Sequence, residues 1–444
     1  MERTITHQLL AWKQSKRRKP LVLEGARQVG KTYSVLHFGE NEYKNIVNLN
    51  FETHPRLCTI FESNLNIDRI IEELQAFAKQ EIIKGETLLF LDEIQACPHA
   101  LTCLKYFKEK ANDYHIIAAG SLLGVQLAKS KSFPVGQVNL LKMYPLTFLE
   151  FLNAIGEHHL SQLLQNKSDR EPLSDLLHSE LVQFLKRYYL IGGMPEAVDV
   201  YAHHKDFALV REVHHEILAT YMKDFSKHAV PSEVMRITAV WDTLPAQLAR
   251  AHKKFIYSIL SSSARAREYE SAINWLKTAG LVHKAHQLQS LKLPLNAYID
   301  HQAFKLYMLD VGLLATKSDL NYAMLIEGNR LFTEFKGALT ENYVAQQLTA
   351  TGYDLYYWVS GNKAEVDFIV KHDDQLIPLE VKAEVNTKSK SLSVYKKQCH
   401  PSYAVKTSLK NIHQRGNTIE WPLYLIERLV VHDGFGTRTP SSFE

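Results

Sequence analysis

Cysteine is scarce in this chain of 444 residues, and none of its four cysteines stands in a C-x-x-C pair. That usage excludes a disulfide framework and indicates a chain kept in a reducing compartment. Long apolar runs are also absent: no segment approaches the ~18 apolar residues of a membrane span, and the N-terminal segment lacks the apolar core of a signal peptide. Together these absences predict a cytoplasmic protein without a membrane partner.

A strong charge bias is missing too. The formal net charge is +4 and the pI about 8.6, a mildly basic balance that by itself identifies no partner. Hydrophobic residues make up 45% and charged residues 23% of the chain, as in ordinary globular proteins. The 21 histidines lack a metal-binding spacing, which favours surface or structural roles. At this length we expect two or three domains, and nothing in the sequence specifies an oligomeric state.

Short apolar runs alternate with helical patterns in the first third of the chain. Fully apolar runs between helices are typical of buried parallel strands, so they predict an α/β domain. The four runs are 21–24, 46–51, 88–91 and 116–119.

The pattern changes after residue 145. Helices are predicted over 181–190 and 209–225, separated by the glycine-proline turn IGGMP at 191–195. Residues 253–300 fit a small helical region ending in a β-wing, with its strands at 280–284 and 293–298. The last block begins with a helix and continues with strands, and is therefore α/β again.

The segment GARQVGKT (25–32) has the form of a phosphate-binding loop. Glycine is needed where the backbone folds closely around phosphates, and Gly25 and Gly30 stand at those positions. The loop N–H groups and the following helix N-terminus then face the anion. Lys31 would reach the β- and γ-phosphates, and the Thr32 hydroxyl would bind Mg²⁺. Because an apolar strand precedes the loop, we interpret it as an ATP site and not as an ordinary glycine turn.

Two acids, Asp92 and Glu93, end the strand that begins at Thr87. Side chains at the carboxyl end of a buried strand point to where α/β proteins bind ligands. We therefore predict that Asp92 holds Mg²⁺, directly or through water, and that Glu93 polarises the attacking water. The alternative is a solvated strand end. Ser121, after the strand at 116–119, could sense the γ-phosphate or the water, although Gly-Ser after a strand is also an ordinary turn.

Residues 364–370 and 375–383 have the pattern of two strands joined by a polar turn. Side chains alternate between the two faces of a strand. Pairing these strands therefore gathers Asp367, Glu380 and Lys382 into one polar cluster. The alternative is an ordinary surface hairpin with charged residues at its outer positions.

Such a cluster fits metal-dependent phosphodiester cleavage, and Glu341, on a helix predicted over 334–348, could complete it. Asp367 and Glu380, with Glu341, would bind one or two Mg²⁺ or Mn²⁺ ions, and Lys382 would position or polarise the nucleophile. Several lysines after the cluster could contact the phosphates of DNA or RNA in a salt-dependent way, and they fit a solvated helix face equally well. These are Lys388, Lys390, Lys396 and Lys397, with Tyr395 among them.

Taken together, the motifs resemble the AAA+ ATPases of the archaeal-ATPase-like branch that carry a C-terminal restriction-endonuclease-like, PD-(D/E)XK, domain. The resemblance rests on GARQVGKT (25–32), LFLDEIQ (89–95), AAGS (118–121), YPLTFLEFL (144–152), IGGMPEAV (191–198), FKLYMLDVGLL (304–314), EVDF (365–368) and LEVKA (379–383). It implies an α/β fold with a P-loop AAA+ core over 1–150, a helical lid region over 151–230, a winged-helix-like domain over 231–326 and a nuclease-like domain over 327–444. Val366 stands where the nuclease pattern has a proline.

One departure from the resemblance concerns hydrolysis. Many relatives carry a basic residue in the glycine motif before the PLTF segment, where this chain has Gln137. An arginine finger can contribute ~10³–10⁵ to the rate. The resemblance therefore implies slow hydrolysis or an arginine supplied from elsewhere, with Arg265 and Arg267 as candidates.

The sequence thus favours an ATP-binding AAA+ ATPase that acts on DNA or RNA and carries a metal-dependent nuclease domain. The first alternative is an ATP-controlled switch whose nuclease-like domain recognises a nucleic acid or protein without cutting. The second is a motor that remodels protein or DNA.

Overall fold

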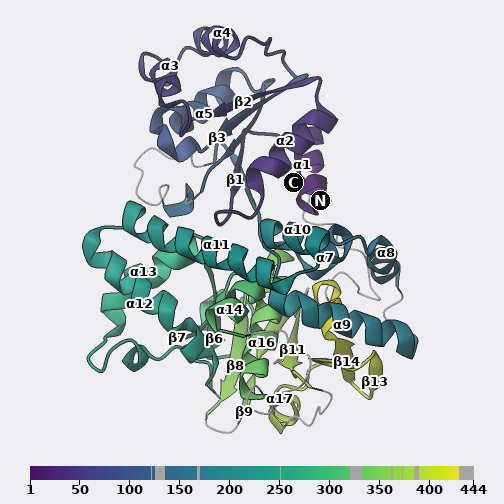
Figure 1. The fold of residues 1–444 in the computed structure, drawn as a ribbon. Helices are drawn as coiled ribbons and strands as arrows, with labels where there is room; N and C mark the ends of the chain where they lie inside the picture. Colours follow the sequence, from purple (N-terminus) through teal and green to yellow (C-terminus); the bar gives the residue numbers. More distant parts are fainter. Residues whose placement is uncertain are drawn as a thin grey trace. The chain divides into compact units, whose positions relative to one another are not determined.

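The structure is a computed structural model that divides into two compact units (Figure 1). The N-terminal unit holds residues 2–144 and 278–280, and the C-terminal unit holds residues 145–277 and the described residues from 281 onward. The residues that the structure describes are 1–121, 123–125, 136–167, 171–250, 252–320, 333–361, 364–372, 374–384 and 390–429.

A five-stranded parallel sheet forms the centre of the N-terminal unit, in the order β2-β3-β4-β1-β5. Its strands are β1 Leu21–Glu24, β2 Asn45–Asn50, β3 Thr87–Asp92, β4 His115–Ala119 and β5 Asn139–Lys142. The four apolar runs of the sequence are strands β1 to β4, so the predicted α/β core with parallel strands is confirmed. The fifth strand escaped prediction because it is short and only partly buried.

Helices surround this sheet: α1 Ile5–Gln14, α2 Lys31–Glu42, α3 Cys58–Glu62, α4 Ile67–Ala78 and α5 Pro98–Lys110. Two short 3₁₀ turns, η1 Pro55–Leu57 and η2 Ile94–Ala96, lie between elements. Helix α4 begins where the Asn66 side chain accepts a hydrogen bond from the Asp68 N–H, a usual N-cap. Its buried face packs with strands β2, β3 and β4 in one apolar core. That core holds the carboxyl ends of the strands, and the loops after them, in place.

The C-terminal unit is mainly helical in its first half. The described helices are α7 Phe148–Ala154, α8 His158–Asn166, α9 Asp175–Ile191, α10 Pro195–His204, α11 Phe207–His228, α12 Pro231–Leu248, α13 Ala266–Thr278, α14 Val311–Lys317, α16 Thr333–Ala350 and α17 Lys390–Cys399. The helices predicted at 181–190 and 209–225 are parts of α9 and α11. Gly192, at a φ of 68°, ends α9, and Pro195 begins α10, as expected for a glycine stop and a proline start. None of the helices in the described ranges combines the length and the apolar character needed to cross a membrane.

Two sheets complete the C-terminal unit, in the orders β7-β6-β8-β9 and β10-β11-β12-β14-β13. Their strands are β6 Val282–Leu288, β7 Ile299–Met308, β8 Tyr356–Ser360, β9 Ala364–Val366, β10 Phe368–His372, β11 Gln375–Val381, β12 Ala404–Ser408, β13 His413–Arg415 and β14 Thr418–Pro422. Further 3₁₀ turns are η3 Tyr257–Ile259, η4 Leu295–Tyr298 and η6 Leu423–Arg428. The prediction of a wing strand over 293–298 was wrong: this segment holds the turn η4, and the strand follows it. Strand β6 pairs with β7 on one side and with β8 on the other, so the sheet runs across the boundary predicted near residue 327.

The strand predicted over 364–370 is also different in the structure. It is interrupted at Asp367, and its two halves join different sheets: β9 pairs with β8, and β10 pairs with β11. Val366 and Phe368, on either side of the break, are both buried. Each half satisfies its backbone groups with a different neighbour. The Asp367 side chain, between the two halves, accepts a hydrogen bond from the Val381 N–H of β11.

Helix α16 is fastened by buried hydrogen bonds from three sequence motifs. Gln347 accepts from the Phe148 N–H at 3.0 Å. Gln346 donates to Asp310 at 3.1 Å, and Asp310 in turn accepts from the Gly193 N–H at 2.6 Å. Buried polar groups that are satisfied in this way rigidify their surroundings. The PLTF, IGGMP and MLD motifs therefore position the helix that carries Glu341.

Candidate nucleotide site and acidic centre

The phosphate-binding loop of the N-terminal unit connects β1 to α2. Gly30 has a φ of 93° and Gly25 a φ of 152°, backbone conformations that favour glycine. A Cβ atom on Gly25 would lie 2.4 Å from the carbonyl oxygen of Met143. The backbone requirement that the sequence predicted for glycine is therefore present at both positions.

Lys31, the first residue of α2, lies over this loop. Its ammonium group donates to the carbonyl oxygens of Gly25 at 3.0 Å and Ala26 at 2.8 Å. Burial lowers the pKa of Lys31 to about 8, although the neighbouring carboxylates of Glu93 and Asp92 counteract it. A buried cation that is held by loop carbonyls can exchange these partners for a phosphate.

Asp92 lies at the end of β3, where the Thr32 hydroxyl approaches its carboxylate at 3.2 Å. Asn50 donates to the same carboxylate at 3.1 Å. Burial and the charge of Glu93 raise the pKa of Asp92, while these hydrogen bonds oppose the rise. The structure thus brings together Thr32 and Asp92, as the sequence predicted. Asn50 was missed, because its place opposite Asp92 depends on the pairing of β2 with β3, which the sequence pattern does not specify.

Glu93 follows in a left-handed conformation, with a φ of 50°. One of its carboxylate oxygens accepts from the Ser121 hydroxyl and the other from the Ser121 N–H, both at 3.2 Å. Gln95 also donates to this carboxylate. The structure therefore places Ser121 beside Glu93, and it adds Gln95, which sequence reasoning did not single out.

The residues considered for an arginine finger lie outside this cluster. Gln137 is half-buried, and the residues 133–135 before it lie outside the described part of the chain. Arg265 and Arg267 are exposed at the beginning of α13 in the C-terminal unit.

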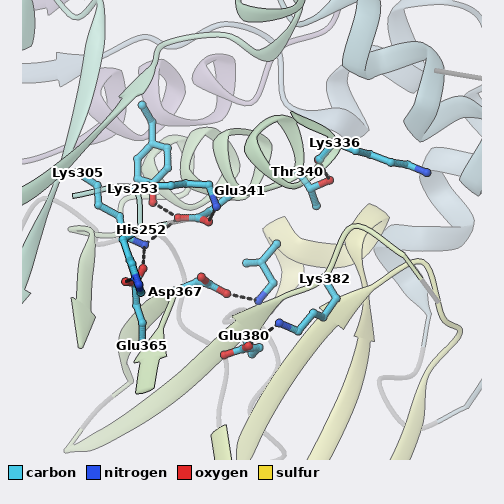
Figure 2. Close-up of polar contacts among 12 residues, drawn as sticks. His252, Lys253, Lys305, Lys336, Thr340, Glu341, Glu365, Asp367, Glu380 and Lys382 are labelled. Carbon is cyan, nitrogen blue, oxygen red and sulfur yellow. Dashed lines mark hydrogen bonds and ion pairs between the residues drawn. The ribbon is translucent and has the colours of Figure 1, made fainter. Parts of the chain in front are cut away.

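The acidic centre of the C-terminal unit lies where β9, β10, β11 and α16 meet (Figure 2). Phe368 pairs with Leu379 in the antiparallel ladder, so Asp367 and Glu380 are the next opposed positions. Asp367 accepts a hydrogen bond from the Val381 N–H at 2.8 Å, and Lys382 pairs with Glu380 at 2.6 Å. The predicted cluster of Asp367, Glu380 and Lys382 is therefore present as an arrangement of side chains.

Burial and like charge disturb the titration of this centre. Burial raises the pKa of Asp367, and the carboxylates of Glu341 and Glu380 raise it further. The ammonium group of Lys382 has its pKa raised, because Glu380 and the other carboxylates outweigh the effect of burial. Carboxylates that share a site in this way favour a bound cation or proton.

Glu341 has partners that the sequence did not suggest. Lys305, on β7, approaches its carboxylate at 3.0 Å, and Lys253 and the Tyr307 hydroxyl also contact it. Lys305 lies 2.5 Å from Glu365 as well (Figure 2). A lysine within the apolar second half of β7, residues 303–308, was the available signal, because such a charge is rarely buried without a partner.

The donors of this centre decide whether a metal ion fits. Within the residues that the structure describes, no group of three or more histidine, cysteine, aspartate or glutamate side chains is arranged to hold a metal ion. Both oxygens of Glu341, the third ligand that the sequence suggested, are engaged by two lysines and a tyrosine. Glu380 Oε2, however, is buried without a hydrogen-bond partner among the described residues. Asp367 and Glu380 alone thus fit a divalent cation, because Mg²⁺ often uses one or two carboxylates and keeps its waters.

The lysines proposed to contact nucleic acid differ in their surroundings. Lys390 and Lys397 are exposed on α17, Lys396 donates to the Thr418 hydroxyl at 2.8 Å, and Lys388 lies outside the described residues. Tyr395 is buried against the Trp358 ring at a centroid distance of 5.1 Å. It is therefore a core residue.

Residues 17–152 match a family model described as an AAA domain. This part of the chain is therefore similar to AAA domains. Residues 182–323 and 336–426 match two further models, each described as a domain of unknown function. No curated protein matches the chain significantly.

Three solved structures show distant likeness. A Walker-type ATPase from Pyrococcus abyssi is 13% identical, with 71% of this chain and 95% of that chain covered and a TM-score of 0.43. Orc1 from Aeropyrum pernix in complex with DNA is 13% identical over 71% and 90%, with a TM-score of 0.28. Hsp104 from S. cerevisiae with ADP is 14% identical over 62% and 37%, with a TM-score of 0.27. At these TM-scores the likenesses define neither the fold nor the function of this chain.

Proposed function

We propose that the AAA domain binds ATP with Mg²⁺ and hydrolyses it. The observation that carries the proposal is the convergence of Lys31, Thr32, Asp92 and Glu93 on one end of the parallel sheet. Two strand ends and a helix N-terminus meet there, which is the arrangement that holds a nucleotide in α/β proteins. When bound, Mg²⁺ would neutralise charge that develops on the phosphates.

The side chains of the site have separate roles. Lys31 exchanges its hydrogen bonds to the loop carbonyls for hydrogen bonds to phosphate oxygens, and Thr32 and Asp92 supply the oxygen ligands that Mg²⁺ prefers. Glu93 accepts hydrogen bonds on both carboxylate oxygens from Ser121. A carboxylate oxygen can accept two hydrogen bonds, so Oε1, which accepts from the Ser121 hydroxyl, can also orient and polarise a water molecule. Ser121 and Gln95 set the position from which Glu93 acts.

Two variants test this assignment. Lys31→Ala should weaken ATP binding, because no other ammonium group lies on these loop carbonyls in the described residues. Glu93→Gln should bind ATP normally and turn it over slowly, because the amide keeps the shape and loses the charge. Fluorescent-nucleotide binding and phosphate release measure the two effects separately. Wild-type turnover in Glu93→Gln would contradict the roles given to the two acids.

A second candidate function is metal-dependent cleavage of DNA or RNA by the C-terminal region. Asp367, Glu380 and Lys382 support it, because two carboxylates and a lysine at the end of a strand pair can hold a cation and a nucleophile. In this proposal 327–444 is nuclease-like, 231–326 winged-helix-like and 151–230 a helical lid. A switch that recognises nucleic acid or protein without cutting it is the competing proposal.

Incubation of the full chain with single- and double-stranded DNA and RNA separates these proposals. The reactions contain Mg²⁺ or Mn²⁺, with and without ATP, and Asp367→Ala is the matched variant. The cleavage proposal is supported if the wild type cuts nucleic acid and Asp367→Ala does not, while both proteins turn over ATP at the same rate. Binding without cutting under every condition favours the switch.

A further inference from the structure

Gly120, which lies between strand β4 and Ser121, is a glycine that its own backbone does not require. Its φ lies outside the positive range that favours glycine, in contrast to the φ values of Gly25 and Gly30 in the phosphate-binding loop. A residue with a side chain could therefore adopt the same backbone conformation. The position is buried, so the reason for a glycine lies in the space around it.

The space beside Gly120 is filled by the side chain of Gln95, from the 3₁₀ turn η2. A Cβ atom on Gly120 would lie 1.9 Å from Gln95 Oε1 and 3.0 Å from Gln95 Cδ. Side chains in a protein interior are already packed as closely as their van der Waals radii allow. Any side chain at position 120 would therefore push the Gln95 amide out of its place.

The other end of the same amide holds Glu93. Gln95 Nε2 donates to Glu93 Oε2, which also accepts from the Ser121 N–H at 3.2 Å. Gln95 Oε1 is buried and accepts no hydrogen bond within the described part of the chain. A reversed amide would direct Oε1 at the Glu93 carboxylate, which is itself an acceptor. The charge-assisted hydrogen bond to Glu93 therefore fixes the orientation of the amide, although it leaves Oε1 unsatisfied.

We propose that Gly120 is a positioning residue for ATP hydrolysis: the gap that it leaves admits the Gln95 amide, and the amide keeps the Glu93 carboxylate where it acts on water. This inference rests on the proposed ATPase function. The carboxylate is held from two neighbouring strands, by Gln95 after β3 and by Ser121 after β4. Gly120 and Ser121 thus serve the same carboxylate, one by lacking a side chain and the other by donating hydrogen bonds.

A methyl group at position 120 should disturb catalysis more than folding. The atom that it would meet first is the end of a flexible side chain, which can swing aside. Glu93, with its φ of 50°, has a backbone conformation that persists where surrounding contacts hold it. Gly120→Ala should therefore release the Gln95 amide from Glu93 while the chain keeps its fold.

ATP turnover by the full chain and binding of a fluorescent ATP analogue test the proposal. Gln95→Ala and Gly120→Ala should each lower kcat by about 10- to 100-fold, because a small misplacement of a catalytic group can cost about 100-fold in rate. Nucleotide affinity should stay at the wild-type value, since Lys31 and Asp92 are untouched. Gln80→Ala is the matched control: Gln80 is an exposed glutamine of the same unit, and its loss should change neither quantity.

Combined variants separate this role from a general loosening of the fold. In the Gln95→Ala background the gap is empty, so adding Gly120→Ala should lower kcat no further, because changes that act on one contact do not add. In a Glu93→Gln background neither change should lower the residual turnover, because both act through the Glu93 charge. Should Gly120→Ala alone fail to fold, the double variant takes its place: turnover equal to that of Gln95→Ala supports the proposal, and lower turnover refutes it.

Wild-type kcat in either single variant would overturn the proposal, as would losses that add in the double variant or a parallel loss of nucleotide affinity. A wild type without ATP turnover would refute the ATPase proposal, and hydrogen exchange of the nucleotide-free chain then decides whether Gly120 positions Glu93. The Ser121 N–H, which donates to Glu93, should exchange faster in Gln95→Ala and Gly120→Ala by about fivefold or more, as the loss of one hydrogen bond predicts. Equal exchange in the wild type and both variants would refute that role.

Discussion

Replacing Lys305 with methionine removes the buried ammonium group of the acidic centre and keeps much of the side chain's length. Lys305 is fully buried, lies 3.0 Å from Glu341 and 2.5 Å from Glu365, and stands over the Tyr357 ring at 4.8 Å. Burial alone would lower its pKa, but Glu341, Glu365 and Asp367 raise it, so the group is charged in the folded protein. The variant leaves two carboxylates without this partner.

The expected loss of unfolding free energy follows from that burial. Removal of one partner from a buried ion pair costs about 3–5 kcal/mol, because the other charge stays buried and uncompensated. The double variant Lys305→Met/Glu341→Gln should recover part of this loss, since it also removes one orphaned charge. Lys336→Met is the matched control: its partner Glu384 is exposed, and such surface pairs contribute only about 0–1 kcal/mol.

Tryptophan fluorescence during urea unfolding can report on the C-terminal unit alone. Trp12 lies in the N-terminal unit, so a Trp12→Phe background confines the signal to the C-terminal unit. The remaining tryptophans are Trp241, Trp275, Trp358 and Trp421. A loss below about 1 kcal/mol in Lys305→Met, equal to that of the control, would refute the ion-pair network. So would a double variant whose loss is the sum of the two single losses, because coupled residues do not add.

Three further outcomes are expected. Asp92→Asn should weaken nucleotide binding in the presence of Mg²⁺ more than in its absence, and an equal effect with and without the metal would contradict a metal-binding role. Burial lowers the pKa of His214 to about 4, so on acidification the unfolded chain binds a proton before the folded protein does. The free energy of unfolding should therefore fall by roughly 3 kcal/mol as the pH drops from about 6.5 to 4. His214→Asn should make the urea midpoint less dependent on pH over that range. Burial raises the pKa of Glu427 to about 7, so the contribution of its protonated form to the free energy of unfolding falls as the pH rises from about 4.5 to 7. Glu427→Gln should remove that decline in the urea midpoint.

The amino-acid sequence alone specified the local features of this protein. Apolar runs bounded by helical patterns placed β1 to β4, because burial on both faces of a parallel sheet leaves little choice of residue. The glycine positions of the phosphate-binding loop followed from backbone sterics. Asp92 and Glu93 could be predicted as site residues because they follow an apolar strand, and the carboxyl ends of buried parallel strands are where α/β proteins bind ligands.

Partners that lie far apart in the chain were decided only by the tertiary structure. Asn50 meets Asp92 because β2 is the neighbour of β3, an order that no local pattern encodes. The break at Asp367 arises because the residues before it pair with β8 in one sheet and those after it pair with β11 in the other. Glu341 was expected to complete the metal-binding cluster from the helix that precedes the two strands, yet Lys305 reaches it from a strand 36 residues away. Side-chain periodicity gives the face of an element but not the element opposite, and the opposite element determines whether a buried carboxylate pairs with an ammonium group or stays open to a cation.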